Sequence, residues 1–172
     1  MITTEEIAEI LKNRKDGIYE TEITPHGHVE AQLVNRVDSN KSYGLVVHPI
    51  KEKLILRVWV SPIARIRRDS NIFRSLTKVN FGLRCGCVGT QDNGSVTFQI
   101  NHICTEVDNG PSPEIIERLL DESIEAVQLI EEVVLYGAMV ESGVPRDRAD
   151  QIVKNLLGND QKDENTGSEV TL

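Results

Sequence analysis

The sequence lacks any long hydrophobic segment, and its N-terminus does not have the pattern of a secretion signal. No window approaches the roughly 18 apolar residues that a membrane-spanning helix requires, and the mean hydropathy is −0.27. Residues 1–17 place acids before bases and carry no apolar stretch of the kind a signal peptide uses. We therefore expect a protein without a membrane span that resides in the cytoplasm.

Cysteine and the motifs of enzyme chemistry are also scarce. The chain has three cysteines, an odd number that suits reduced thiols better than a disulfide framework. It contains no G-x-x-x-x-G-K-[ST], G-x-G-x-x-G or G-x-S-x-G motif, and none of its four histidines adjoins an evident nucleophile. The sequence therefore predicts a protein that is not an enzyme and that uses no cofactor.

Positive charge is limited overall and concentrated in one segment. The formal net charge is −8, which opposes nucleic-acid affinity because binding to phosphates requires basic side chains. Residues 57–78 hold six bases and one acid, whereas residues 114–141 hold eight acids and one base. These segments either are solvated or face each other, or else Arg65, Arg67 and Arg68 form a basic surface for an acidic partner. We expect a protein partner in preference to a nucleic acid.

Hydrophobic periodicity predicts an α+β domain with an antiparallel sheet. Thr3 and Glu6 have the spacing of a capping box, so a helix begins there and ends near residues 16–17. Alternating or β-rich runs predict strands at residues 18–24, 28–34, 42–48 and 52–60, with residues 61–69 ambiguous. Further along we expect a short helix from the cap Ser70 to the cap Asn80, a hairpin at 83–104, and a long helix at 113–141 after the cap Ser112.

The last part of the chain differs in composition from the rest. Residues 146–157 predict a short final helix, whereas residues 158–172 show no periodicity and hold four acids against one lysine. A polar, acidic segment of this kind cannot bury enough apolar surface to fold. We therefore assign residues 1–157 to a single domain and residues 158–172 to a disordered acidic tail.

The strand at residues 52–60 has apolar side chains on both of its faces. Leu56, Val58 and Val60 share one face with Leu54, and the opposite face carries Ile55, Arg57 and Trp59. A face of this composition should be covered by another element or by a partner chain. Ile55, Arg57 and Trp59 are therefore the predicted partner-binding residues, together with Arg65, Arg67 and Arg68.

Residues 83–104 hold all three cysteines, and two functions compete for them. Asn93-Gly94 favours a two-residue hairpin turn. With that turn, Cys87 pairs with Ile100, Cys85 with His102 and Leu83 with Cys104, and all the thiols lie on the core face. Buried thiols behave as small hydrophobic groups, and a flat hairpin is poor geometry for a tetrahedral metal ion.

We therefore interpret Cys85, Cys87 and Cys104 as core thiols, with a metal site that includes His102, or redox chemistry, as the alternatives. His26 and His28 have H-x-H spacing, but no acidic or cysteine partner is evident at a fixed offset, so we interpret them as part of a polar turn.

One stretch resembles a known family. Residues 70–103 combine an apolar helix that ends in L-x-x-V-N (Leu76, Val79, Asn80), a strand of small residues, a D-N-G turn and an alternating strand (Val96, Phe98, Ile100). This pattern resembles the YbjN-like branch of the type III secretion chaperone-like fold. Over residues 1–141 the resemblance implies the element order α-β-β-β-α-β-β-α.

The resemblance also implies a function. Members of the fold often pair as homodimers through the sheet and the intervening helix, and the secretion chaperones among them hold client segments in extended form. The YbjN-like members are linked to regulation or stress responses. We therefore expect a homodimeric protein-binding, chaperone-like or regulatory module. The alternative is a metal- or redox-responsive regulator that uses the three cysteines.

Overall fold

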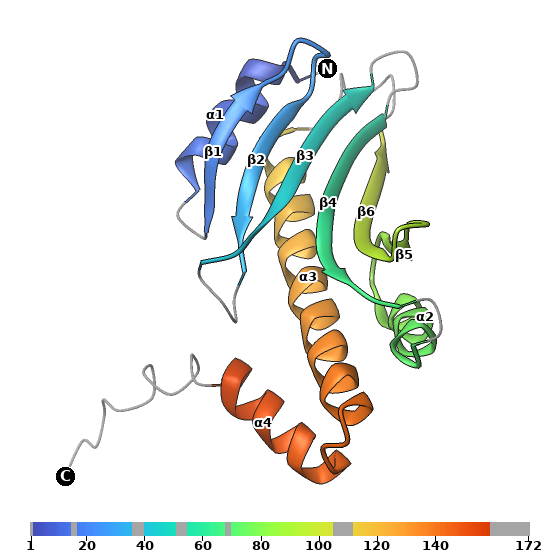
Figure 1. The fold of residues 1–172 in the computed structure, drawn as a ribbon. Coiled ribbons are helices and arrows are strands. Elements are labelled where there is room, and N and C mark those ends of the chain that lie inside the picture. The colour runs from blue at the N-terminus through green and yellow to red at the C-terminus, as the bar shows by residue number, and fades with distance from the viewer. Residues whose placement is uncertain are drawn as a thin grey trace, which may run out of the picture.

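The predicted α+β class is confirmed by the computed structural model, which describes residues 2–14, 17–35, 40–50, 55–67, 70–104 and 112–158 (Figure 1). The predicted tail lies outside these residues apart from its first residue, Gly158. The elements are α1 (Thr4–Asn13), β1 (Ile18–Ile23), β2 (Val29–Val34), β3 (Ser42–Ile50), β4 (Ile55–Arg65), α2 (Ile72–Gly82), β5 (Cys87–Thr90), β6 (Ser95–Ile103), α3 (Pro113–Glu141) and α4 (Arg146–Gly158). There is one more strand before the middle helix than the family resemblance implied, and α4 is additional.

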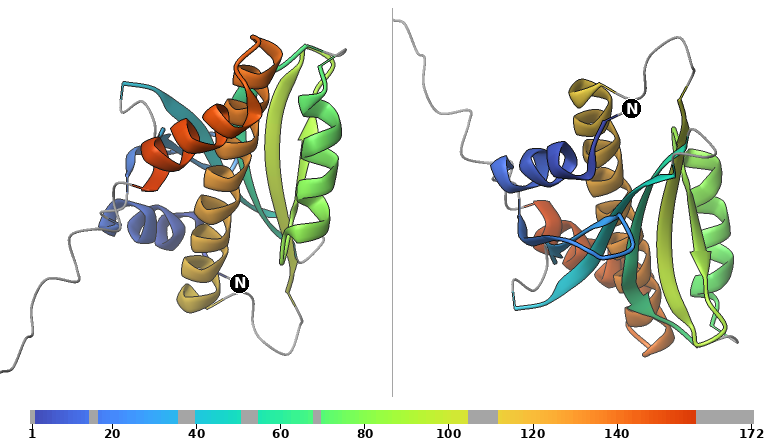
Figure 2. Two further views of the ribbon diagram at one scale, coloured as in Figure 1. Left: turned by 90° about the horizontal axis from the view of Figure 1, so that it is seen from below. Right: turned by 90° about the horizontal axis from the view of Figure 1, so that it is seen from above.

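The six strands form one antiparallel sheet in the order β1-β2-β3-β4-β6-β5. Both α1 and α3 lie on the same side of this sheet, behind the strands in the view of Figure 1 and beside them in Figure 2. The middle helix α2 packs against the edge strand β5 and against α3. The molecule therefore has a sheet with a layer of α1 and α3 on one side, and α2 lies at the β5 edge.

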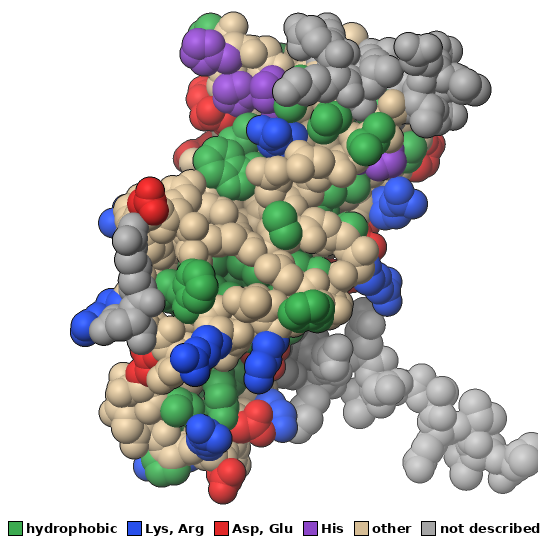
Figure 3. All heavy atoms as spheres, turned by 90° about the vertical axis from the view of Figure 1, so that its right-hand side faces the viewer, with side chains coloured by type: hydrophobic (Ala, Val, Ile, Leu, Met, Phe, Trp, Pro, Cys, Tyr) green, Lys and Arg blue, Asp and Glu red, His purple; other side chains and the backbone are tan. Residues whose placement is uncertain are grey.

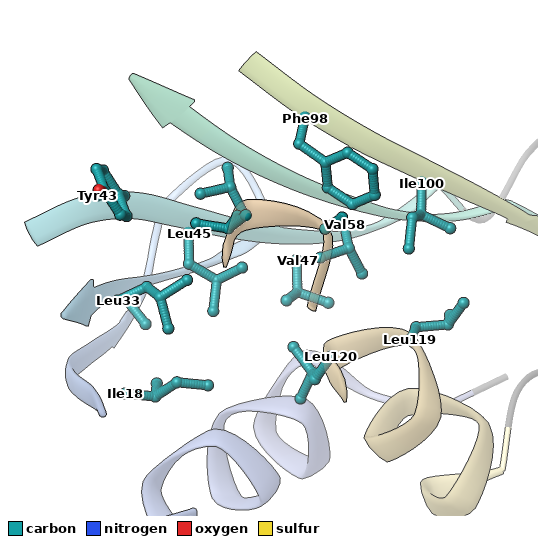
Figure 4. Close-up of a cluster of buried hydrophobic side chains, with 14 of the residues drawn as sticks. Ile18, Leu33, Tyr43, Leu45, Val47, Val58, Phe98, Ile100, Leu119 and Leu120 are labelled. Carbon is teal, nitrogen blue, oxygen red and sulfur yellow. The ribbon is translucent and has the colours of Figure 1, made fainter. Parts of the chain in front are cut away.

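The hydrophobic core lies between the strands and α3 (Figure 4). Side chains alternate across a sheet, so every second residue of the strands reaches this layer. The buried set from the strands includes Val29, Ala31, Leu33, Tyr43, Leu45, Val47, Leu56, Val58, Val60, Val88, Val96, Phe98 and Ile100. On the helix, Ile116, Leu120 and Ile130 are at most 1% exposed. Each such side chain contributes about 1.5–3 kcal/mol by leaving water.

The first helix has the start that the sequence predicts and is tied to α3. The Thr3 side chain accepts a hydrogen bond from the Glu6 backbone N–H at 3.2 Å, and Glu6 Oε2 accepts one from the Thr3 N–H at 2.8 Å. Just after the helix, Arg14 contacts Glu117 at 2.8 Å and Asp121 at 2.6 Å. Two acids of the acidic segment 114–141 thus pair with Arg14 and not with a base of segment 57–78.

The end of α3 caps the start of α2. Glu141 Oε1 accepts hydrogen bonds from the Asn71 backbone N–H and the Ser70 hydroxyl, both at 2.7 Å. A carboxylate at this position is favourable because the N–H groups at a helix N-terminus carry partial positive charge. The N-cap is Asn71, one residue after the predicted Ser70, although Ser70 Oγ still accepts a hydrogen bond from the Ile72 N–H at 3.1 Å.

The predicted end of α2 at Asn80 was wrong, and Asn80 instead contacts β5. The helix continues past Asn80 to Gly82. The Asn80 amide donates to the Val88 carbonyl at 3.0 Å and accepts from the Val88 N–H at 2.7 Å. These two bonds imitate a strand ladder, so Asn80 holds β5 against the helix.

Residues 61–69, which the pattern left ambiguous, are partly strand. β4 continues to Arg65, with a shift of register against β6 between Val60 and Ala64. An irregularity of this kind bends a strand and re-aims the side chains beyond it. Residues 68 and 69 lie outside the described residues.

The hairpin register that the sequence predicted was wrong by one residue. The loop has three residues, because Gln91 N donates to Ser95 O and Gly94 N donates to Gln91 O, both at 2.9 Å. Gly94 adopts a φ of +81°, the left-handed third position of such a loop. The one-residue shift turns every β5 side chain over.

The β1–β2 connection is a turn of the same class. Thr24 N donates to His28 O at 2.9 Å, Gly27 N donates to Thr24 O at 3.0 Å, and Gly27 has a φ of +76°. The two loops differ in their surroundings. A Cβ on Gly94 would lie 2.3 Å from the Ile66 carbonyl oxygen, whereas a Cβ on Gly27 would meet nothing within 4 Å.

We predict that Gly94→Ala destabilises the fold much more than Gly27→Ala. Both replacements force alanine into the left-handed region at a cost of about 1–2 kcal/mol, but only Gly94→Ala also creates a clash, which adds about 1–3 kcal/mol. Urea unfolding followed by circular dichroism measures both costs. Equal costs for the two variants would contradict the observed packing of Gly94 on Ile66.

Candidate functional site

The second face of the sheet is not covered by any helix among the described residues, and Figure 1 looks onto it. We call this surface the open face. The cross-strand register arranges it in three neighbouring rows. Its members are Glu30, Val46, Trp59, Gln99 and Cys87 in the first row, His48, Arg57 and Asn101 in the second, and Ile50, Ile55 and Ile103 in the third.

The first row centres on Trp59. This side chain lies between Val46 of β3 and Gln99 of β6, which are its direct cross-strand neighbours. All three are half-buried. Because large aromatic side chains with one exposed side bury much area at low entropic cost, they dominate many protein interfaces. Trp59 is therefore the main anchor that this face offers.

The second and third rows add a charged group and an apolar end. Arg57 Nε donates a hydrogen bond to Asn101 Oδ1 at 3.0 Å, so the guanidinium is directed along the sheet towards β6. Beyond it, Ile55 pairs with Ile50 on one side and Ile103 on the other. Ile103 is 73% exposed. The three predicted residues of β4, Ile55, Arg57 and Trp59, thus lie together on the open face.

Two of the three predicted arginines beyond the open face lie within the described residues. Arg65 and Arg67 are both exposed, and Arg68 lies outside the described residues. Arg67 lines a shallow cavity of about 310 Å³ with Phe73 and Asp92. In Figure 3, which shows the side of the molecule at the right of Figure 1, the basic side chains are scattered among acidic and apolar ones.

The three cysteines occupy three different environments, which corrects the expectation that all are core thiols. Cys104 is buried, Cys85 is half-buried and Cys87 is exposed. Cys87 pairs with Gln99 instead of Ile100, so the slipped register places it on the open face. Burial, and then the charge and hydrogen bond of Glu122, raise the pKa of the Cys85 thiol.

Sequence reasoning missed a group of histidines at one end of the open face. The ring centres of His26 and His28 lie 6.3 Å apart, and those of His28 and His48 lie 5.4 Å apart. Glu30 Oε1 lies 2.8 Å from His28 Nε2, so an acidic partner does exist for the H-x-H pair. The signal was the alternation of β3, which places His48 on the open face, and the register then puts it opposite His28.

A buried polar network lies on the other side of the sheet. The Asn35 amide donates to the Tyr43 hydroxyl, which in turn donates to Glu131 Oε1. Glu131 is only 7% exposed and lines two cavities, of about 450 and 270 Å³, along the inner side of α3. The hydroxyl offsets part of the cost of burying this carboxylate.

Neither a membrane helix nor a preformed metal centre is found among the described residues. No helix there is long and apolar enough to cross a bilayer. No group of three or more His, Cys, Asp or Glu side chains there stands in a metal-binding arrangement as placed. Comparison with known proteins adds nothing, because no family model, no curated protein and no solved structure matches the chain.

We predict that a thiol reagent modifies the cysteines in the order Cys87, Cys85, Cys104. The thiolate is the reactive form, so exposure favours Cys87 and the raised pKa of Cys85 slows its reaction at pH 7. Cys104 should react only on unfolding. Mass spectrometry of peptides after timed labelling measures each rate.

The variant Glu122→Gln tests the cause of the slow reaction at Cys85. Removing the charge lowers the pKa of Cys85 and should speed its labelling, while the rate at Cys87 stays unchanged. Equal rates at Cys85 with and without Glu122 would contradict the contribution of that carboxylate.

Proposed function

We propose that the protein is a non-enzymatic protein-binding module that uses the open face and that it forms a homodimer through this face. The observation that carries the proposal is the half-buried Trp59 on a face that no described helix covers. Val46 beside it and the isoleucines of the third row extend the apolar surface. Apolar surface gains free energy on leaving water, at about 25 cal/mol per Å².

The charges of the open face favour a second copy of the chain as the occupant. In a twofold symmetric dimer the same patch meets itself, so each residue contacts its partner's counterpart across the axis. Such a patch must carry both signs of charge around its apolar centre. Glu30, next to Val46 in the first row, and Arg57, in the second row beside Trp59, meet this requirement.

Membership of the YbjN-like branch of the secretion chaperone-like fold is part of the same proposal. The α+β architecture with its antiparallel sheet agrees with that fold at the level of class. Its members often dimerise through the sheet, which is where the open face lies. The same resemblance extends the proposal to an extended client segment as a further partner of the dimer, and the cytoplasm is the expected compartment.

The alternative, a metal- or redox-responsive regulator, stays a prediction. Its best support is Cys87, which is exposed on the open face. A modification of that thiol would alter the same surface that binds the partner. The labelling order predicted above shows whether Cys87 has the accessibility that such a regulator requires.

We predict that Trp59→Ala weakens self-association at least tenfold. Truncation of a central aromatic anchor commonly costs about 2 kcal/mol or more, and each 1.4 kcal/mol is about a tenfold change in the dissociation constant. Light scattering over a range of concentrations measures the dimer, and a pull-down from lysate measures client capture.

The matched control is Leu129→Ala. Leu129 is 37% exposed on α3, at the other side of the sheet, so its truncation should leave the dimer intact. The proposal fails if the wild-type chain is monomeric at all concentrations and captures no partner. It fails equally if Trp59→Ala changes neither dimer nor capture.

A further inference from the structure

We propose that His26, His28 and His48 bind one divalent transition-metal ion of the zinc class, with Glu30 orienting His28. Three of the four histidines of the chain are brought together, His48 from β3 and His26 and His28 from the connection between β1 and β2. Figure 3 shows histidine side chains gathered near one end of the molecule, with another set apart. This site uses residues of a single chain and does not depend on the proposed dimer.

Backbone geometry brings the three side chains to the same place. Val29 pairs with Val47 in the β2–β3 ladder, so His28 and His48 are direct neighbours one position further along it. The three-residue turn that follows β1 returns the chain so that His26 stacks on His28, with an angle of 11° between the rings. Both arrangements depend on main-chain hydrogen bonds and not on side-chain packing alone.

The ring separations are close to those of a metal-bound set. With Zn–N bonds of about 2.1 Å and tetrahedral angles, two imidazole centres on one ion lie about 5 Å apart. The His28–His48 separation of 5.4 Å already meets this value, and the His26–His28 separation of 6.3 Å exceeds it by little. As placed, the His26 ring is nearly parallel to that of His28, so their in-plane lone pairs do not meet at one ion. Because His26 is exposed, rotation of its side chain to another staggered position would bring its nitrogen to the ion.

Glu30 supplies the second contact that metal-binding histidines usually have. Since a carboxylate can only accept hydrogen bonds, His28 Nε2 must carry the proton that it donates to Glu30 at 2.8 Å. The other ring nitrogen, Nδ1, then presents its lone pair to the ion. Such carboxylate–histidine–metal arrangements fix the tautomer and make the imidazole a better ligand.

The surrounding charges permit a cation here. Glu22 pairs with Glu30 across β1 and β2, so a second carboxylate lies next to the one that contacts His28. Arg57 is the cross-strand neighbour of His48, but its guanidinium is held towards Asn101 by the hydrogen bond at 3.0 Å. The net charge of −8 adds a favourable background for a cation.

Imidazole ligands select the type of ion. Nitrogen donors suit zinc, copper and nickel, whereas magnesium and calcium prefer oxygen ligands. Three histidines leave a fourth tetrahedral position for water or for a donor from a bound partner. We therefore use Zn²⁺ as the probe and Mg²⁺ as the ion that should not compete.

Calorimetric titration of the purified, metal-free full chain with Zn²⁺ tests the proposal. We expect one ion per chain, binding that excess Mg²⁺ does not reduce, and loss of most of the affinity in His28→Gln and in His48→Gln. Glu30→Gln should retain the site with about 10–100-fold weaker binding, the range found when a supporting carboxylate is removed.

His102→Gln is the matched control, because it removes the one histidine outside the cluster and should bind Zn²⁺ as the wild-type chain does. His26→Gln tests the third ligand and should weaken binding more than Glu30→Gln does. Circular dichroism of each variant confirms that it is folded. The proposal is overturned if wild type does not bind Zn²⁺, if His48→Gln binds as tightly as wild type, or if His102→Gln loses the ion.

Discussion

The structure depends on burial of one face of the sheet against α3. Alternate residues of the strands meet the apolar stripe of the helix, and Phe98, Val58 and Val47 are completely buried there. Because the period of a strand is two residues, this contact also decides which side chains point the other way. Trp59, Arg57 and Ile55 lie half-buried on the open face because Val58 and Val60 are buried in the core. The open face is therefore a consequence of the core.

A few polar contacts fix the two ends of the sheet and so decide where Cys87 and the histidines lie. Glu141 and Asn80 hold α2 and β5 in place, so the edge strand presents Cys87 to the open face. At the other end, the turn at Gly27 brings His26 back over His28. An apolar centre with a basic group beside it and imidazoles at its margin supports the proposal of a binding surface.

Local patterns predicted the fold class and the common face of Ile55, Arg57 and Trp59 on β4 from the sequence. The two-faced pattern around Trp59 needed only the alternation of a strand. The hairpin register could not be predicted, since D-N-G suits both a two-residue and a three-residue loop and only the packing of Gly94 on Ile66 decides between them. The His28–His48 pair was missed because a cross-strand contact depends on the register of two separate segments.

The measurement that most directly tests the central claim is quenching of Trp59 fluorescence by acrylamide at increasing protein concentration. Trp59 is the only tryptophan of the chain, so the signal reports on the open face alone. We predict that its emission shifts to the blue and that quenching decreases over the same concentrations at which light scattering shows the mass doubling. A mass that doubles while the emission and quenching of Trp59 stay constant would contradict the account, because the dimer would then use another surface.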